Sequence, residues 1–163
     1  MNGNMPRFIG AFWLTLLISV ALNNIPLPPE WMHWRPDWVV LALINWALII
    51  RQNTSLTIAF LIGLLTDALA SSLLGQHAFG YVVVTYFAVR LGLRMSAESF
   101  IQQFALLFIV IGIYMLVNLW IRGMTGTSTE ALLRYWTPLF SSLLIWPVYQ
   151  SIMSYFYISR KSI

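Results

Sequence analysis

The chain has 163 residues, of which 60% are hydrophobic and only 9% are charged, and its mean hydropathy is +0.78. A typical soluble domain carries about 25% charged residues, so there is too little charge here to cover a surface that faces water, and we expect a protein solvated by lipid. The net charge of +4 comes from scattered single arginines rather than a basic stripe, which argues against a nucleic-acid partner, and the absence of cysteine excludes disulfides and thiolate sites.

Six apolar stretches are candidate membrane helices, because a hydrocarbon core of about 30 Å takes about 20 helical residues. They cover residues 8–25, 38–50, 55–74, 79–93, 100–121 and 138–158. The predicted fold is therefore an all-α membrane protein, a bundle of six transmembrane helices in one integral membrane domain over residues 1–163. The second and fourth stretches are short, so a count of five spans stays open.

Basic residues predict the orientation, since cytoplasmic loops of membrane proteins are enriched in Arg and Lys. An N-terminus inside the cell puts six basic residues inside and three outside. The inner set is Arg7, Arg51, Arg90, Arg94, Arg160 and Lys161, and the outer set is Arg35, Arg122 and Arg134. Both termini are predicted to be cytoplasmic, and we expect the first helix to be retained rather than cleaved as an export signal.

The segment NNIPLPPEWMHWRPD, residues 23–37, joins the first two stretches and contains four prolines. Proline lacks a backbone donor and restricts the residue before it, so we expect this segment to be extended rather than helical. At its end, Asp37 is a candidate N-cap for the second helix and Trp38 a candidate anchor at the membrane interface. Arg35 is either part of this helix start or a residue that binds a partner.

Asp67 places a carboxylate inside an apolar helix. A central aspartate costs about 3 kcal/mol to insert, so the carboxylate should face protein rather than lipid. At 100° per residue, a stripe of small residues shares its face, where another backbone can approach closely. The members of the stripe are Gly63, Asp67, Ala70 and Ser71.

Two interpretations of Asp67 stay open, a hydrogen-bonding link between helices and a proton relay or ligand site. We favour the link, because the other four acids lie in or beside loops and a relay needs partners. The expected partner is a serine, asparagine or arginine on another helix, with Arg90 as the first candidate.

The remaining polar residues indicate packing rather than chemistry. Side-chain amides in or near the spans commonly bridge membrane helices, and those here are Asn45, Gln102, Gln103 and Asn118. Pro147 predicts a kink in the last helix, with Ser142 or a water meeting the freed carbonyl. The two histidines, His33 and His77, are expected on outer loops and do not suggest a metal site. No catalytic grouping, metal set or cofactor motif is visible, so we expect a protein that is not an enzyme.

Three segments together carry a resemblance to a known family. They are RPDWVVLALINWALII from Arg35 to Ile50, GLLTDALASSLLG from Gly63 to Gly75, and the Trp146-Pro147 pair. Over nearly its full length the chain resembles MreD, the rod shape-determining integral membrane protein of the bacterial elongation machinery. The matching motif positions are Arg35, Pro36, Asp37, Trp38, Gly63, Asp67 and Gly75, and the resemblance implies structural or partner-binding roles for them.

The resemblance also implies a function and a fold. It implies a multi-pass, non-enzymatic component of the inner membrane that binds MreC and, through it, MreB and RodA with its transpeptidase, and so regulates rod shape and lateral peptidoglycan synthesis. The implied fold is similar to the substrate-binding membrane subunit of energy-coupling transporters. The alternative is a small-molecule-binding transporter subunit, in which Asp67, Asn118 and outer-loop aromatic residues would bind a solute.

Overall fold

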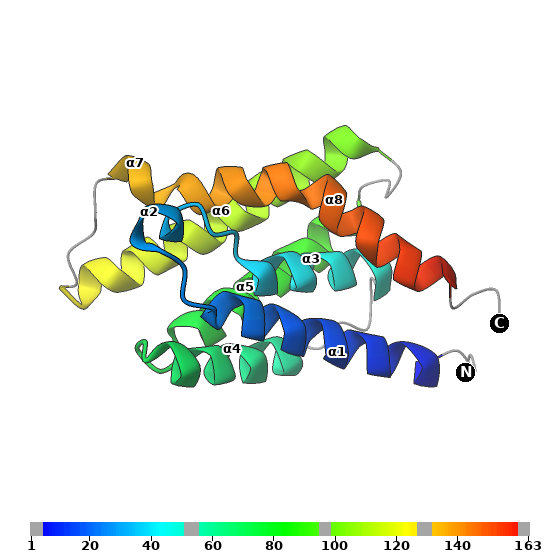
Figure 1. Ribbon diagram of the computed structural model, residues 1–163, viewed down its shortest axis with the longest axis horizontal. Coiled ribbons are helices and arrows are strands. Elements are labelled where there is room, and N and C mark those ends of the chain that lie inside the picture. The colour runs from blue at the N-terminus through cyan, green and yellow to red at the C-terminus, as the bar shows by residue number, and fades with distance from the viewer. Residues whose placement is uncertain (1–4, 51–55, 95–98, 127–131, 160–163) are drawn as a thin grey trace.

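The computed structural model describes residues 5–50, 56–94, 99–126 and 132–159, and every regular element in those ranges is a helix. The helices described are α1 (Met5–Asn24), α2 (Pro29–Met32), α3 (Trp38–Ile50), α4 (Leu56–Ala70), α5 (Gln76–Gly92), α6 (Phe100–Met124), α7 (Leu132–Tyr135) and α8 (Thr137–Ser159). The predicted all-α class is confirmed. Figure 1 shows the six long helices packed side by side, with α2 and α7 at one end of the bundle.

The six long helices coincide with the six predicted stretches, with differences at their ends. The third stretch was expected to reach residue 74, but α4 ends at Ala70 because Ser71 adopts a left-handed backbone conformation with φ of 49°. A residue in that conformation ends a helix. The next helix begins at Gln76 instead of residue 79. His77, expected on a loop, therefore lies in the first turn of α5.

The prediction of an extended segment between the first two long helices is wrong for Pro29–Met32, which forms the short helix α2. Proline is unfavourable inside a helix but suits its first turn, where the missing N–H has no helical partner. Pro29 occupies that position. The prolines thus place the start of this helix instead of preventing it.

Helix α3 forms the centre of the bundle. Every side chain from Val39 to Ala47 is buried. A helix that is apolar all round is buried on all sides, and α3 contacts α1, α5 and α8. Around it the other long helices turn large apolar side chains outward, and Leu144 and Ile101 are 79% and 82% exposed. The core and the outer surface of the bundle are therefore both apolar, as expected for a helical protein surrounded by lipid.

Within the described residues, one helix is long and apolar enough by itself to cross a bilayer, Phe100–Met124, with a hydropathy of 2.5. Three shorter apolar helices are Gly10–Asn24, Trp38–Ile50 and Leu56–Ala70. At about 1.5 Å per residue, the 13 residues of α3 cover about 20 Å. The number of spans is therefore not fixed by helix length.

Two of the predicted amide bridges form. Gln76 Nε2 donates to Asn118 Oδ1 at 3.0 Å, which joins α5 to α6. Trp146 Nε1 donates to Gln103 Oε1 at 3.2 Å, which joins α8 to α6. The prediction for Asn45 is wrong, because its buried Nδ2 makes no hydrogen bond within the described part of the chain.

Helix α8 continues through Pro147, and Figure 1 shows it changing direction along its length. The expectation that Ser142 meets the carbonyl freed by this proline is wrong. Its Oγ is buried and has no hydrogen-bond partner among the described residues.

Candidate functional site: two carboxylate junctions between helices

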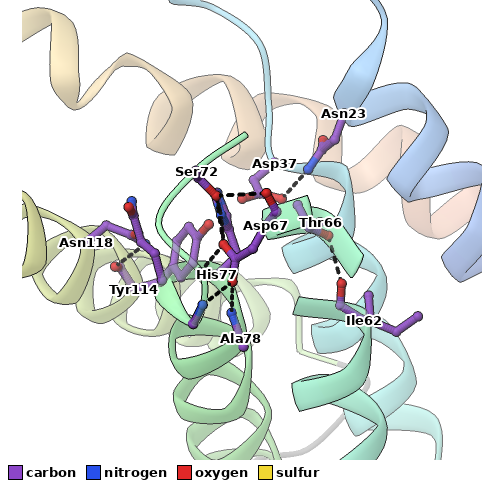
Figure 2. A network of polar contacts seen from close by, with 12 residues as sticks. Asn23, Asp37, Ile62, Thr66, Asp67, Ser72, His77, Ala78, Tyr114 and Asn118 are labelled. Atoms are coloured by element: carbon purple, nitrogen blue, oxygen red, sulfur yellow. Dashed lines mark hydrogen bonds and ion pairs between the residues drawn. The ribbon is translucent and has the colours of Figure 1, made fainter. Parts of the chain in front are cut away.

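Asp67 is buried at the end of α4, and its carboxylate accepts hydrogen bonds from the start of α5. Gly75 N and Ala78 N donate to Oδ2 at 2.8 and 3.3 Å. His77 donates to Oδ1 through its backbone N at 2.9 Å, and its ring Nδ1 lies 2.8 Å from the same oxygen. Ser72 Oγ also donates to Oδ1, at 2.8 Å. Five contacts therefore converge on one carboxylate (Figure 2).

The chain between the two helices brings the carboxylate to this position. Ser71 ends α4, and Gly75 takes a φ of 100°, a left-handed conformation that favours glycine. The first backbone N–H groups of a helix have no partner within it and carry a partial positive charge. Asp67, on the preceding helix α4, accepts hydrogen bonds from these N–H groups of α5 and places a negative charge beside them. The motif residue Gly75 serves the same junction by allowing the turn.

Gly63 lies one turn before Asp67, where α4 passes close to the backbone of the first turn of α5. A Cβ atom built on Gly63 would lie 2.2 Å from the Ala78 Cα and 2.5 Å from its N, far inside van der Waals contact. The predicted close approach along the small-residue stripe is therefore confirmed at Gly63 and Asp67. Ala70 and Ser71, the other two members, are exposed, because α4 ends there.

The expectation of Arg90 as the partner of Asp67 is wrong. Asp67 contacts the first turn of α5, whereas Arg90 lies in the last turn of the same helix. The 13 residues from His77 to Arg90 correspond to about 20 Å of helix rise. The guanidinium of Arg90 instead lies over the Tyr86 ring, 5.8 Å from its centroid.

Asp37 forms a second junction of the same kind. Its Oδ1 accepts from Val40 N at 3.2 Å, which confirms the predicted N-cap of α3. Asn23, near the end of α1, donates from Nδ2 to the same Oδ1 at 2.9 Å and accepts from Trp38 N at its Oδ1 at 3.0 Å. The pair Asn23 and Asp37 thus joins the end of α1 to the start of α3.

The other motif residues surround the start of α3. Arg35 Nη1 donates to the Ile25 carbonyl at 3.1 Å, which holds the segment containing α2 against the end of α1. Pro36 is buried and Trp38 is partly buried against the core. The motif residues therefore form two groups, one at the α1–α3 junction and one at the α4–α5 junction. Both lie at the same end of the bundle, which we call the junction end (Figures 1 and 2).

Sequence reasoning missed the donors Asn23, Ser72 and His77. The two-asparagine end of α1 was a signal for a cap, but its partner 14 residues later could not be identified from spacing alone. Ser72 and His77 were assigned to a helix and a loop, and the observed boundary between α4 and α5 reverses both assignments.

The junction end has the residue types of a Ser-His-Asp set but not its geometry. In a catalytic set the aspartate orients one ring nitrogen and the other nitrogen activates the serine. Here Nδ1 of His77 lies 3.2 Å from Ser72 Oγ and 2.8 Å from Asp67 Oδ1, so the serine and the aspartate contact the same ring nitrogen. Among the described residues no group of three potential metal ligands occurs. The arrangement holds helices together.

Comparison with known proteins identifies the family. A family model described as rod shape-determining protein MreD matches residues 6–157. The chain belongs to the MreD family. One relative is the rod shape-determining protein MreD of Haemophilus influenzae, which is 31% identical over 144 residues, 83% of this chain and 85% of the relative.

No solved structure matches the chain significantly. The expected similarity to the substrate-binding subunits of energy-coupling transporters therefore stays a prediction. Membership of the MreD family, together with apolar surfaces inside and outside the helical bundle, makes the chain a membrane protein of the rod shape-determining type.

Proposed function

We propose that the chain is a six-span scaffold of the bacterial inner membrane that binds MreC directly and regulates rod shape and lateral peptidoglycan synthesis, without catalysing a reaction. MreB and RodA with its transpeptidase would belong to the same assembly. Membership of the MreD family supports the role in shape. The observation that favours a scaffold is the use of the buried Asp67 carboxylate, whose Oδ1 and Oδ2 accept from His77 N and Gly75 N and so join α4 to the start of α5.

A relay or a substrate ligand needs a polar group with an open coordination position or a mobile proton. Three of the five contacts of Asp67 come from backbone N–H groups, which do not carry protons in a relay and which hold the carboxylate in place. The other two, from Ser72 Oγ and the His77 ring, belong to the same α4–α5 junction and both meet Oδ1. Asp37 likewise caps α3 and binds Asn23. Association of helices in lipid depends on close packing and interhelical hydrogen bonds, and the motif residues Gly63 and Asp67 supply one of each.

The six-span topology rests on three observations. The start of α1 and the end of α8 lie at the same end of the bundle, as an even number of passes requires (Figure 1). The short helix α3 is surrounded by other helices, so the lipid thickness does not set its length. Arg90 and Arg94 at the end of α5 lie away from the junction end, as inner-side residues should. Arg51, Arg160 and Lys161, also predicted inside, lie outside the described residues.

The topology can be tested with reporter fusions. A phosphatase fused at Gly126, after α6, should be active outside the cytoplasm, and a fluorescent protein fused after residue 163 should be fluorescent inside. A C-terminal reporter on the outer side would reject six spans in favour of five.

The function can be tested in cells and in membranes. A clean deletion should produce rounded cells, and the intact gene supplied in trans should restore rods. The tagged protein should co-purify with MreC from detergent-solubilised membranes, with an unrelated polytopic protein of similar size as the control. Normal rods in the deletion strain would reject the shape function, and rounded cells without recovery of MreC would reject direct binding but retain the shape function.

A further inference from the structure

The outward face of α5 ends in two arginines. Arg90 and Arg94 are both exposed, and Tyr86, one turn before Arg90 on the same face, is exposed as well. Leu93, the C-cap of α5, keeps helical backbone angles, so the chain continues this face to Arg94. The end of α5 that lies away from the junction end therefore presents two positive charges and one phenol ring to the surroundings of the bundle.

The Arg90 guanidinium lies beside the preceding turn of its own helix. Its central carbon is 5.8 Å from the centroid of the Tyr86 ring. Arginines near the ends of membrane helices commonly extend toward water, whereas this contact holds the charge on the side of the helix that faces lipid. A cation in that position needs an anion close to it.

The described part of the chain offers no carboxylate to these arginines. Its three carboxylates all belong to the junction end, and they are Glu30, Asp37 and Asp67 (Figure 1). The 17 residues of α5 place about 25 Å of helix between that end and the arginines. Glu98, the next acid in the sequence, lies outside the described residues. An anion from outside the chain therefore fits these two charges.

We propose that the end of α5 binds the headgroup of an anionic phospholipid, with the lipid phosphate held between Arg90 and Arg94 and with Arg90 oriented by the Tyr86 ring. A guanidinium can donate two parallel hydrogen bonds to phosphate oxygens, and its flat face can stack on an aromatic ring at the same time. Two positive charges without a carboxylate favour a headgroup with a net negative charge over a zwitterionic one. The placement of this lipid in the inner leaflet rests on the proposed six-span topology, but the binding itself does not.

The rest of this face of α5 fits the acyl chains of the same lipid. Toward the junction end it continues through the partly buried Val83 to the exposed Phe79. The 11 residues from Phe79 to Arg90 correspond to about 16 Å of helix, and half of a hydrocarbon core is about 15 Å thick. A phospholipid with its phosphate at Arg90 therefore matches the face in both polarity and length.

Lipid binding by the purified full chain tests the site. In native mass spectrometry, phosphatidylglycerol should bind more tightly than phosphatidylcholine, and Arg90→Gln and Arg94→Gln should each weaken the apparent affinity for phosphatidylglycerol about fivefold. Arg134→Gln, which removes an exposed charge at the other end of the bundle (Figure 1), is the matched control and should not weaken the affinity. Equal binding of the two lipids, or equal losses in all three variants, would overturn the proposal.

A second pair of variants tests the orientation of Arg90 at constant net charge. Tyr86→Leu removes the ring and should weaken the binding of phosphatidylglycerol, whereas Phe79→Leu, about two turns away on the same face, should not weaken it. The thermal unfolding midpoint of the lipid-free protein should be the same in all variants, because the changed side chains are exposed. If Tyr86→Leu binds the lipid as well as the unmodified protein, charge alone attracts the lipid and the oriented site is rejected.

Inorganic phosphate separates a lipid site from a site for the free anion. Millimolar phosphate should neither displace phosphatidylglycerol nor raise the midpoint of the lipid-free protein. A rise that Arg90→Gln abolishes would replace the lipid with free phosphate. All these measurements use the purified chain alone, so their failure would leave the shape function and the binding of MreC untouched, and a failure of those would leave the lipid site untouched.

Discussion

Substitution of Asp67 tests whether its carboxylate holds α4 and α5 together. Asp67→Asn keeps one oxygen, which can take over the three contacts of Oδ1, but turns an NH₂ group toward Gly75 N and Ala78 N. Two hydrogen bonds and a negative charge at a helix start are lost, together about 3 kcal/mol. Asp67→Leu leaves all the donors unpaired, at about 1–3 kcal/mol each, which approaches the whole stability of a domain.

The two variants should therefore differ in degree. For a chain of this size about 1 kcal/mol corresponds to about 2–4 °C, so Asp67→Asn should lower the unfolding midpoint in detergent by about 10 °C and still support rods. Asp67→Leu should yield little folded protein by fluorescence-detected gel filtration, and the cells should be round. Ala68→Leu, at the adjacent exposed position, is the control for adding an apolar side chain to α4.

Two results would contradict this reasoning. If Asp67→Asn folds with an unchanged midpoint but the cells lose their rod shape, the carboxylate has a proton-transfer or ligand role. If Asp67→Leu folds as well as Ala68→Leu, the carboxylate does not stabilise the junction.

Three further predictions follow from the contacts. Gly63→Ala forces a Cβ against backbone 2.2 Å away and should lower the free energy of unfolding by about 3 kcal/mol, seen as a lower unfolding midpoint in detergent. Gly10→Ala, where a Cβ meets nothing within 4 Å, should not lower the midpoint. Asn23→Ala and Asp37→Ala should each cost about 1–2 kcal/mol and be non-additive in a double-mutant cycle, because they share one hydrogen bond. Asn45→Leu should stabilise the protein in the same midpoint assay, since it removes a buried Nδ2 without a partner.

The sequence was sufficient to predict the six long helices, though not the short helices α2 and α7, and the N-cap at Asp37, because hydropathy and capping depend on residues close together in the chain. The bounds of α3 and the Asp37 cap show this directly. The glycine at residue 63 also indicated a close helix contact before its partner was known.

The partner of Asp67 could not be predicted, because it depends on where α4 ends. An apolar run through Leu73 and Leu74 favours a longer helix, and hydropathy does not reveal the left-handed backbone at Ser71. With α4 extended to residue 74, the backbone donors of the next helix lie out of reach, and an arginine on another span is the natural candidate. The error in one helix boundary therefore changed the expected chemistry of the site.

Two helices of this chain, α3 and α5, begin inside the membrane protein, where their first backbone N–H groups need hydrogen-bond acceptors. The first N–H groups of α3 and α5 have no helical partners, and lipid offers none. A carboxylate that is buried, like Asp67, or partly buried, like Asp37, has the complementary problem, since its charge needs donors. Asp37 and Asp67 solve both problems together, each by placing its charge at the positive end of a helix. This explains how the two acids are accommodated although, among the described residues, neither forms an ion pair with an arginine, and why the motif residues gather at one end of the bundle.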